Sequence, residues 1–208
     1  PNVRIVNLDG RKPDERQKAW ASADIFCSLS DNIQETFGIT PIEAMAAGIP
    51  VVVSDWDGYK DTVRNDIDGF CVPTMMPPAG LGNDIAYRHA LELDSYDMYC
   101  GYTCSLVSVD VQATTNAFER LFLSAKLRSQ MGEAGRKRAR EIYDWKIIIK
   151  QYEDLWEKIN EIRKQKSVNQ KDPNKGWPAR MDPFHGFATY PTKSLSSKTV
   201  LGLVDVDA

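Results

Sequence analysis

Four short stretches in the first third of the chain have patterns of apolar residues that are typical of strands. Residues 3–7 alternate apolar and polar, which predicts a strand, and residues 25–27 form a short apolar run that predicts a second. Residues 51–53 are three successive valines, as expected for a strand that is covered on both faces. Gly69–Val72 predicts a last, short strand. Each of these runs is separated from the next by a segment with a different pattern.

The separating segments carry helix signals. Pro13 suits the first turn of a helix, where its missing N–H costs nothing. Thr40 and Glu43 form the Thr-x-x-Glu pattern of a capping box, and Gly48 suits the C-terminal stop of the same helix. Residues 59–63 predict a short helix. Strands and helices that alternate with short loops predict an α/β fold, a Rossmann-like parallel sheet flanked by helices.

The second half of the chain is organised differently. Periodicity fails in residues 74–104, where we expect an excursion from the domain with a short helix near residues 87–93. Helices follow, the first of them capped by Ser108. The last begins near Trp145 and carries an amphipathic stripe, which we expect to pack in the core. The stripe's apolar residues are Trp145, Ile148, Ile149, Tyr152, Leu155, Trp156, Ile159 and Ile162.

Two parts of the chain follow from these patterns. Residues 1–165 are interpreted as one Rossmann-like domain. The chain begins inside a strand pattern, so we expect this domain to be incomplete at its N-terminus. Residues 166–208 are polar and proline-containing, and are interpreted as an extended tail.

Composition narrows the class of partner. The formal net charge is −3 and the pI is near 5.5, which gives no electrostatic footprint for nucleic acid. No apolar run reaches the ~18 residues of a membrane span, and no signal sequence opens the chain, so we expect a cytoplasmic protein. A basic cluster on a predicted helix is typical of a solvated face, but it would also suit peripheral contact with anionic lipid at the inner face of a membrane. This cluster consists of Arg136, Lys137, Arg138 and Arg140.

The candidate chemistry lies around the helix that begins near Thr40. Glu35 precedes this helix and Glu43 lies in its first turn, with Gly38 between them. A helix N-terminus presents unpaired N–H groups that bind phosphate, here from Phe37 to Thr40, and Gly38 lets a ligand approach the backbone. Carboxylates beside a phosphate suit a nucleotide sugar. A second interpretation stays open, in which Glu43 only completes the capping box and Glu35 is a solvated loop residue.

The stretch ETFGITPIEAMAAGIPVVVSDWDG resembles the C-terminal-domain signature of retaining GT-B glycosyltransferases of family GT4. The resemblance covers residues 3–72 and resumes at residues 132–145. The residues that carry it are Glu35, Gly38, Glu43, Ala44, Gly48, Pro50, Val51 and Gly58.

The resemblance implies roles for these residues. Glu35 would be the catalytic residue, holding hydroxyls of the donor sugar near the reacting carbon. Gly38, Ile39 and Thr40 would meet the diphosphate and the sugar through backbone groups, with Phe37 beside them. Glu43 would accept from the ribose hydroxyls. The family works without a metal or a cofactor, and a UDP- or GDP-sugar is the favoured donor.

The resemblance also implies parts that we do not find in this sequence. The Arg and Lys that neutralise the diphosphate, and the whole N-terminal Rossmann domain with its glycan or lipid acceptor site, would lie upstream. The last helix would cross back to that domain. We therefore expect this chain alone not to transfer sugar. The alternative is a non-catalytic module of the same fold that binds a nucleotide sugar or a partner.

Overall fold

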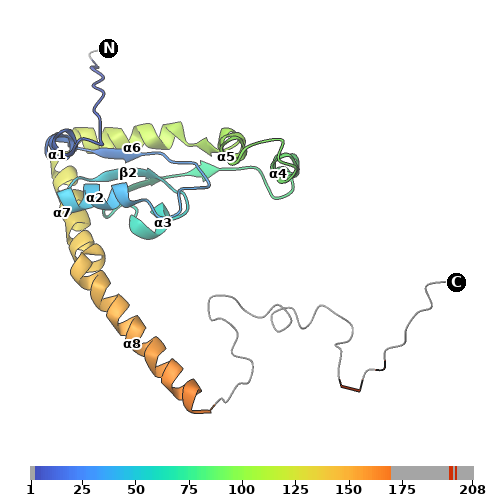
Figure 1. Cartoon of the computed structure of the whole chain (residues 1–208). Helices are drawn as coiled ribbons and strands as arrows, with labels where there is room; N and C mark the ends of the chain where they lie inside the picture. The colour runs from blue at the N-terminus through green and yellow to red at the C-terminus, as the bar shows by residue number, and fades with distance from the viewer. Residues whose placement is uncertain (1–2, 170–196, 199, 201–208) are drawn as a thin grey trace. The chain divides into compact units, whose positions relative to one another are not determined.

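The computed structural model describes residues 3–169, 197–198 and 200 of the chain (Figure 1). Internal contacts divide the chain into residues 1–153 and residues 154–208, and the boundary falls inside helix α8. The strands are β1 (Phe26–Ser28), β2 (Val51–Ser54), β3 (Gly69–Val72), β4 (Thr74–Met75) and β5 (Ser108–Val109). The helices are α1 (Pro13–Ser22), α2 (Ile39–Ala47), α3 (Tyr59–Thr62), α4 (Asn83–Ala90), α5 (Tyr96–Ser105), α6 (Val111–Leu123), α7 (Ala125–Arg138), the π-helical turn η1 (Ala139–Tyr143) and α8 (Trp145–Asn169).

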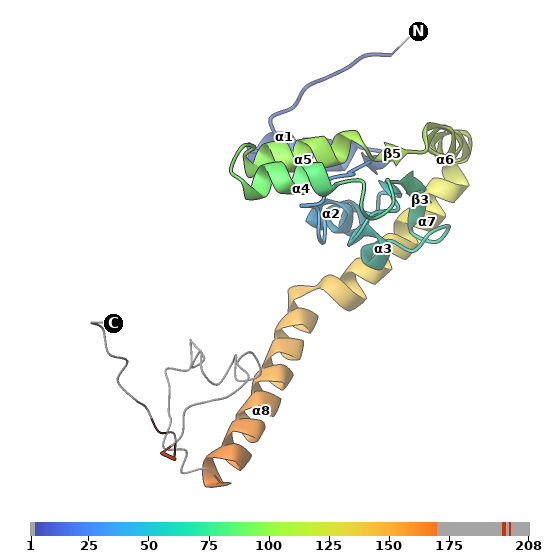
Figure 2. The same cartoon turned by 90° about the vertical axis from the view of Figure 1, so that its right-hand side faces the viewer.

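A three-stranded parallel sheet forms the centre of residues 1–153. Its order is β1-β2-β3, and Cys27 lies opposite Val52, which lies opposite Phe70. Side chains of β2 alternate between the two faces. Val51 and Val53 belong to a core shared with α2, α3 and η1, whereas Val52 belongs to a core shared with α6 and α7. The helices thus cover both faces of the sheet (Figures 1 and 2).

The predicted fold class is confirmed, because a parallel sheet flanked by helices is what the chain forms. All four residues of β2 are buried, as the run of valines predicts. The strand predicted at residues 3–7 is wrong. These residues form no ladder, and Val3 and Ile5 are 78% and 85% exposed. Alternation specifies a face but not a partner, and no described strand lies beside this segment.

The expected excursion is a helical hairpin closed at its base. β4 and β5 pair antiparallel, with Thr74 opposite Val109, and α4 and α5 lie between them (Figure 2). Two helices therefore replace the single helix predicted near residues 87–93. The hairpin has its own ion pair, in which Arg88 donates to the 2% exposed Asp94 at 2.7 Å and 2.8 Å. That contact fixes the end of α4 against the start of the next turn.

The first two helices after the hairpin start with side-chain caps. Asp110 accepts from the N–H of Ala113 and caps α6, so the cap predicted at Ser108 is wrong. Ser108 lies in β5 instead, where the ladder needs its backbone. Ser124 caps α7 by accepting from the N–H of Leu127.

Helix α8 begins at Trp145, as predicted, but its apolar stripe is not core. Trp145 is 74% exposed and Ile149 is 50% exposed, so the expectation that the stripe packs in the core is wrong. A periodic stripe predicts which side chains share a face, and it leaves open what covers them. Among the described residues, no helix is both long and apolar enough to cross a membrane. The predicted tail was residues 166–208, but helix α8 continues to Asn169, and the rest of the tail lies outside the described residues except for residues 197, 198 and 200.

Candidate functional site

The site is built on the amino terminus of α2. Gly38 precedes the helix in the left-handed conformation, with φ 72°, and the helix begins at Ile39. The predicted capping box is therefore wrong, since Thr40 is the second helical residue and Glu43 lies beyond the first turn. Within the described chain, no side chain caps this helix. Its first N–H groups are left for a ligand or for water.

The loop before α2 is tied to the segment that follows β2. Ser54, the last residue of β2, donates its hydroxyl to the carbonyl of Ser30. The indole of Trp56 donates to the carbonyl of Asn32 at 3.0 Å. The side chain of Asn32 accepts from the N–H of Gln34 at 2.9 Å and closes a local turn. Because β1 and β2 are adjacent and parallel, these contacts join the carboxyl ends of two neighbouring strands.

Tyr59, the first residue of α3, contacts both strand β1 and the loop before α2. Its side chain is 1% exposed, and its hydroxyl lies 2.8 Å from the Ser28 hydroxyl. The same hydroxyl donates to Oε2 of Glu35 at 3.4 Å. Burial raises the pKa of the Tyr59 phenol, and the nearby Glu35 carboxylate adds to the rise. The phenol is therefore protonated at neutral pH and available as a donor.

The ring of Tyr59 also explains the glycine at position 38. A Cβ on Gly38 would lie 2.0 Å from Cε1 of this ring. Gly58 makes a second close approach, because its Cβ would lie 2.3 Å from the carbonyl oxygen of Thr36. Glycines thus occupy both sides of the contact between the loop and α3. At Gly58 the loop meets α3 backbone to backbone, whereas at Gly38 it lies against the Tyr59 ring.

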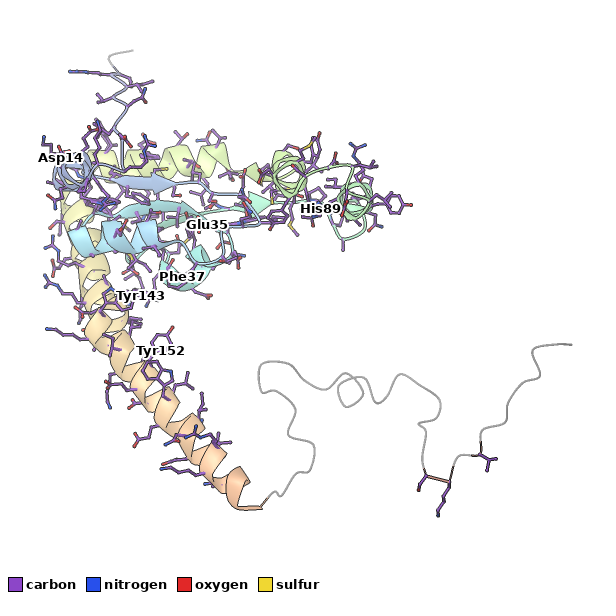
Figure 3. All side chains as sticks on the ribbon, viewed as in Figure 1. Asp14, Glu35, Phe37, His89, Tyr143 and Tyr152 are labelled. Atoms are coloured by element: carbon purple, nitrogen blue, oxygen red, sulfur yellow. The ribbon has the colours of Figure 1, made fainter. Side chains whose placement is uncertain are left out.

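The structure brings most of the predicted site residues to one place. Glu35 is half-buried, and Figure 3 shows it near the amino-terminal end of α2. Ile39 and Thr40 form the exposed first turn, and Glu43 is exposed one turn further along. Phe37 points elsewhere. Its side chain is 47% exposed and meets the ring of Tyr143 edge-on, with centroids 6.2 Å apart.

The predicted basic cluster contains two arginines that bind the protein itself. Arg136 donates to the carbonyl of Ala47 at 2.9 Å, at the carboxyl end of α2. Arg138 donates to the carbonyls of Asp61 and Thr62 at 2.8 Å and 3.0 Å, at the carboxyl end of α3. The partial negative charge at the carboxyl end of a helix stabilises such cations. These two guanidinium groups are thus engaged within the domain and contribute less to any lipid-binding face.

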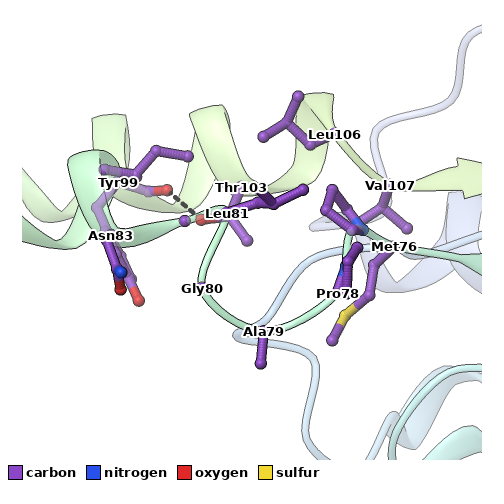
Figure 4. Close-up of a pocket in the computed structure, with 13 residues that line it drawn as sticks. Met76, Pro78, Ala79, Gly80, Leu81, Asn83, Tyr99, Thr103, Leu106 and Val107 are labelled. Carbon is purple, nitrogen blue, oxygen red and sulfur yellow. Dashed lines mark hydrogen bonds between the residues drawn. The ribbon is translucent and has the colours of Figure 1, made fainter.

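The helical hairpin leaves the sheet at the same edge. The N–H of Asp55 donates to the carbonyl of Val72, and the hydroxyl of Thr74 donates to the carbonyl of Asp55 at 3.0 Å. A pocket of about 300 Å³ lies between the loop before α4 and helix α5, with Met76, Leu81, Tyr99 and Leu106 in its wall (Figure 4). The lining is mostly apolar. The part of the chain that the structure describes has no group of three potential metal ligands.

The profile of one protein family, described as glycosyl transferases group 1, matches residues 5–86. This range holds β1, β2, β3 and the whole site around α2. Over these residues the chain is similar to the glycosyl transferases group 1 family. The parallel sheet flanked by helices and the match in sequence thus cover the same residues.

Two individual relatives are similar to this chain over a longer range than the family profile. The chain is 31% identical over 159 residues to the phosphatidyl-myo-inositol mannosyltransferase of Mycobacterium leprae, covering 76% of this chain and 33% of that protein. It is 26% identical over 155 residues to the MMP alpha-(1->4)-mannosyltransferase of Mycolicibacterium hassiacum, covering 74% and 29%. The chain thus spans about a third of the length of these relatives. A solved structure of sucrose-phosphate synthase from Thermosynechococcus elongatus matches with TM-score 0.48 and 24% identity, over 69% of this chain and 27% of that one.

Two residues of this site were missed by sequence reasoning. Ser28 and Tyr59 are 31 positions apart, and they meet only because β1 and β2 end side by side. One signal was available for Ser28, which directly follows a predicted strand at its carboxyl end, where ligand sites of parallel sheets form. Neither residue belongs to the stretch between Glu35 and Glu43 that drew attention.

Proposed function

We propose that this chain is the donor-binding part of a retaining glycosyltransferase that moves a sugar from a nucleotide-diphosphate sugar to an acceptor. The observation that carries the proposal is the uncapped amino terminus of α2 beside Glu35. Phosphate oxygens accept hydrogen bonds from such a terminus and are stabilised by its partial positive charge. A carboxylate at the same place accepts hydrogen bonds from sugar hydroxyls. The two features together match the two ends of a sugar diphosphate.

The proposed roles follow from position. Backbone groups of Gly38, Ile39 and Thr40 bind the diphosphate, because they form the first turn and its approach. Glu35 binds hydroxyls of the donor sugar near the carbon that reacts. Glu43, exposed one turn along α2, accepts from the ribose hydroxyls. The helix terminus supplies positive potential here without a metal ion.

Several parts of the reaction lie outside this chain in the proposal. The relatives are about three times longer than the matched region, which supports a second Rossmann domain that supplies the acceptor site and further cations. Two relatives are named as mannosyltransferases, and this supports a hexose donated from GDP or UDP. The acceptor is a glycan or a lipid. This chain alone is proposed to be inactive, in the cytoplasm or at the inner face of a membrane.

A second candidate function is binding at the same site without catalysis. A non-catalytic module of the same fold would bind a nucleotide sugar at α2 and transfer nothing. Loss of GDP-mannose or UDP-glucose binding in Glu43→Ala, measured by calorimetry, is expected under both candidates. Transfer by the full-length protein that falls at least 100-fold in Glu35→Ala, with the fold intact, is expected only under the first. Unchanged transfer in Glu35→Ala would remove the role assigned to Glu35.

A further inference from the structure

We infer that Tyr59 is the positioning residue of this site: its hydroxyl orients the Glu35 carboxylate toward the donor sugar. The inference rests on the proposed function and adds a residue to it. Tyr59 lies on α3, outside the helix start and the two glutamates to which the donor site has been assigned. It reaches Glu35 from inside the protein, on the side away from solvent.

The direction of the hydrogen bonds is fixed by the number of protons. A phenol has one proton, and the Tyr59 hydroxyl donates it to Oε2 of Glu35 at 3.4 Å. The Ser28 hydroxyl, 2.8 Å away, is then the donor to the phenol oxygen. The result is a relay from the carboxyl end of β1 through Tyr59 to the loop. Tyr59 both accepts and donates, and the relay ends on the carboxylate.

The protein interior holds this relay in place. The Tyr59 side chain is 1% exposed and belongs to the core formed with Met45 and Val53, so the ring has no room to turn. Gly38 lies against the ring so closely that a Cβ would overlap it. The carboxylate of Glu35 therefore receives a donor from a rigid element although Glu35 itself lies on a loop. Catalytic geometry needs such support from residues that are themselves fixed.

A positioning role makes a prediction that a purely structural role does not. Removing the hydroxyl with Tyr59→Phe keeps the ring in the core and takes away the donor that orients Glu35. In the full-length protein we expect kcat with GDP-mannose or UDP-glucose, whichever is used, to fall about tenfold, with the donor KM changed less than threefold. Tyr87→Phe, on the 66% exposed Tyr87 of α4, is the matched control and is expected to leave kcat unchanged.

The decisive comparison is a double-mutant cycle with Glu35. If Tyr59 acts through Glu35, Tyr59→Phe lowers kcat less than twofold when it is added to Glu35→Gln. An equal, tenfold loss in both backgrounds would overturn the inference, because Tyr59 would then act on something else. Ser28→Ala serves if Tyr59→Phe does not fold, since it weakens the same relay without touching the core ring, and the same dependence on Glu35 is expected.

A second readout needs no sugar and separates this inference from the proposed function. Amide hydrogen exchange of residues 31–38 is expected to be at least tenfold faster in Tyr59→Phe than in the wild type or Tyr87→Phe. Unchanged exchange would overturn the positioning role even if sugar transfer is found. If the wild type transfers no sugar, the proposed function fails and the exchange comparison decides whether Tyr59 holds the loop.

Discussion

Replacing Gly38 by alanine tests the contact on which the site depends. Two costs add at this position. A non-glycine residue in the left-handed region costs about 1–2 kcal/mol. A Cβ 2.0 Å from Cε1 of Tyr59 also forces the ring or the loop to move, and overpacking of a core costs about 1–3 kcal/mol. Gly38→Ala is therefore expected to lower the free energy of unfolding by about 2–5 kcal/mol.

Gly80→Ala is the matched control for the backbone cost. Gly80 also has a positive φ, 102°, but a Cβ there would meet no atom within 4 Å. This variant is expected to lose only the backbone cost of about 1–2 kcal/mol. Urea unfolding followed by circular dichroism measures both variants, and for a chain of this size each kcal/mol corresponds to about 2–4 °C in Tm. Equal losses in the two variants would refute the close contact between Gly38 and Tyr59.

The double variant Gly38→Ala/Tyr59→Leu separates the two costs at position 38. A smaller side chain at position 59 gives the new Cβ room, so Gly38→Ala is expected to cost less in this background, by the overpacking part of about 1–3 kcal/mol. Tyr59→Phe is not expected to relieve the overlap, since the atoms that lie against Gly38 are Cε1 and Cδ1, which phenylalanine keeps. Relief by Tyr59→Phe would show that the hydroxyl, and not the ring, sets the distance.

Three further outcomes follow from contacts away from Gly38. Arg138→Lys is expected to lower the free energy of unfolding by about 1–3 kcal/mol, because it removes a guanidinium that donates to two carbonyls, while Arg140→Lys on the exposed face changes it by less than about 0.5 kcal/mol. Burial raises the pKa of the Cys71 thiol from 9.0 to about 11, so at pH 8 its alkylation should be about 100-fold slower than that of an ordinary thiol. The alkylation rate, followed by mass spectrometry, should keep rising up to about pH 11, and a plateau at pH 9 would contradict this. The hydrogen bonds from Arg88 lower the pKa of Asp94, so their contribution to stability is complete above the ordinary pKa of an aspartate and is lost as the pH falls through the lowered pKa. Amide hydrogen exchange in α4 and α5 should therefore become faster in acid, and Asp94→Asn should remove that pH dependence.

The sequence predicted β1, β2 and β3 of the parallel sheet because those signals are local. The run of valines at 51–53 needs cover on both faces wherever it lies, and it is buried. The start of α2 was predicted wrongly for an equally local reason. Thr40 and Glu43 match a capping box, but two residues upstream Gly38 can take a left-handed conformation that starts the helix earlier. A cap pattern shows where a helix can begin, and tertiary contact decided between two candidate starts.

The contacts that position the site could not be predicted, because they join distant parts of the chain. Tyr59 reaches Ser28 across 31 positions, and nothing in either neighbourhood specifies the other. Exposure was equally out of reach. The stripe that begins at Trp145 has the spacing of a core helix, yet Trp145 is 74% exposed. Periodicity reports that one face of a helix is apolar, and packing depends on which elements meet that face.

Helix α2 is fixed at both ends, and this gives its amino terminus a defined position relative to Glu35. At the carboxyl end Arg136 donates to the carbonyl of Ala47 and lies where a Cβ of Gly48 would be, 2.1 Å from its Nη2. A Cβ on Gly132 of α7 would lie 2.1 Å from the carbonyl oxygen of Gly48, so the two helices meet backbone to backbone.

Gly38 and Tyr59 make the matching close contact at the other end of α2. Helix α2 is thus closely packed at both of its ends. Its partial positive charge is therefore presented at a constant place, and stabilisation of developing charge is strongest when the dipoles need not reorganise. The glycines at positions 38, 48 and 132 thus serve the site by fixing α2, although only Gly38 lies at the site itself.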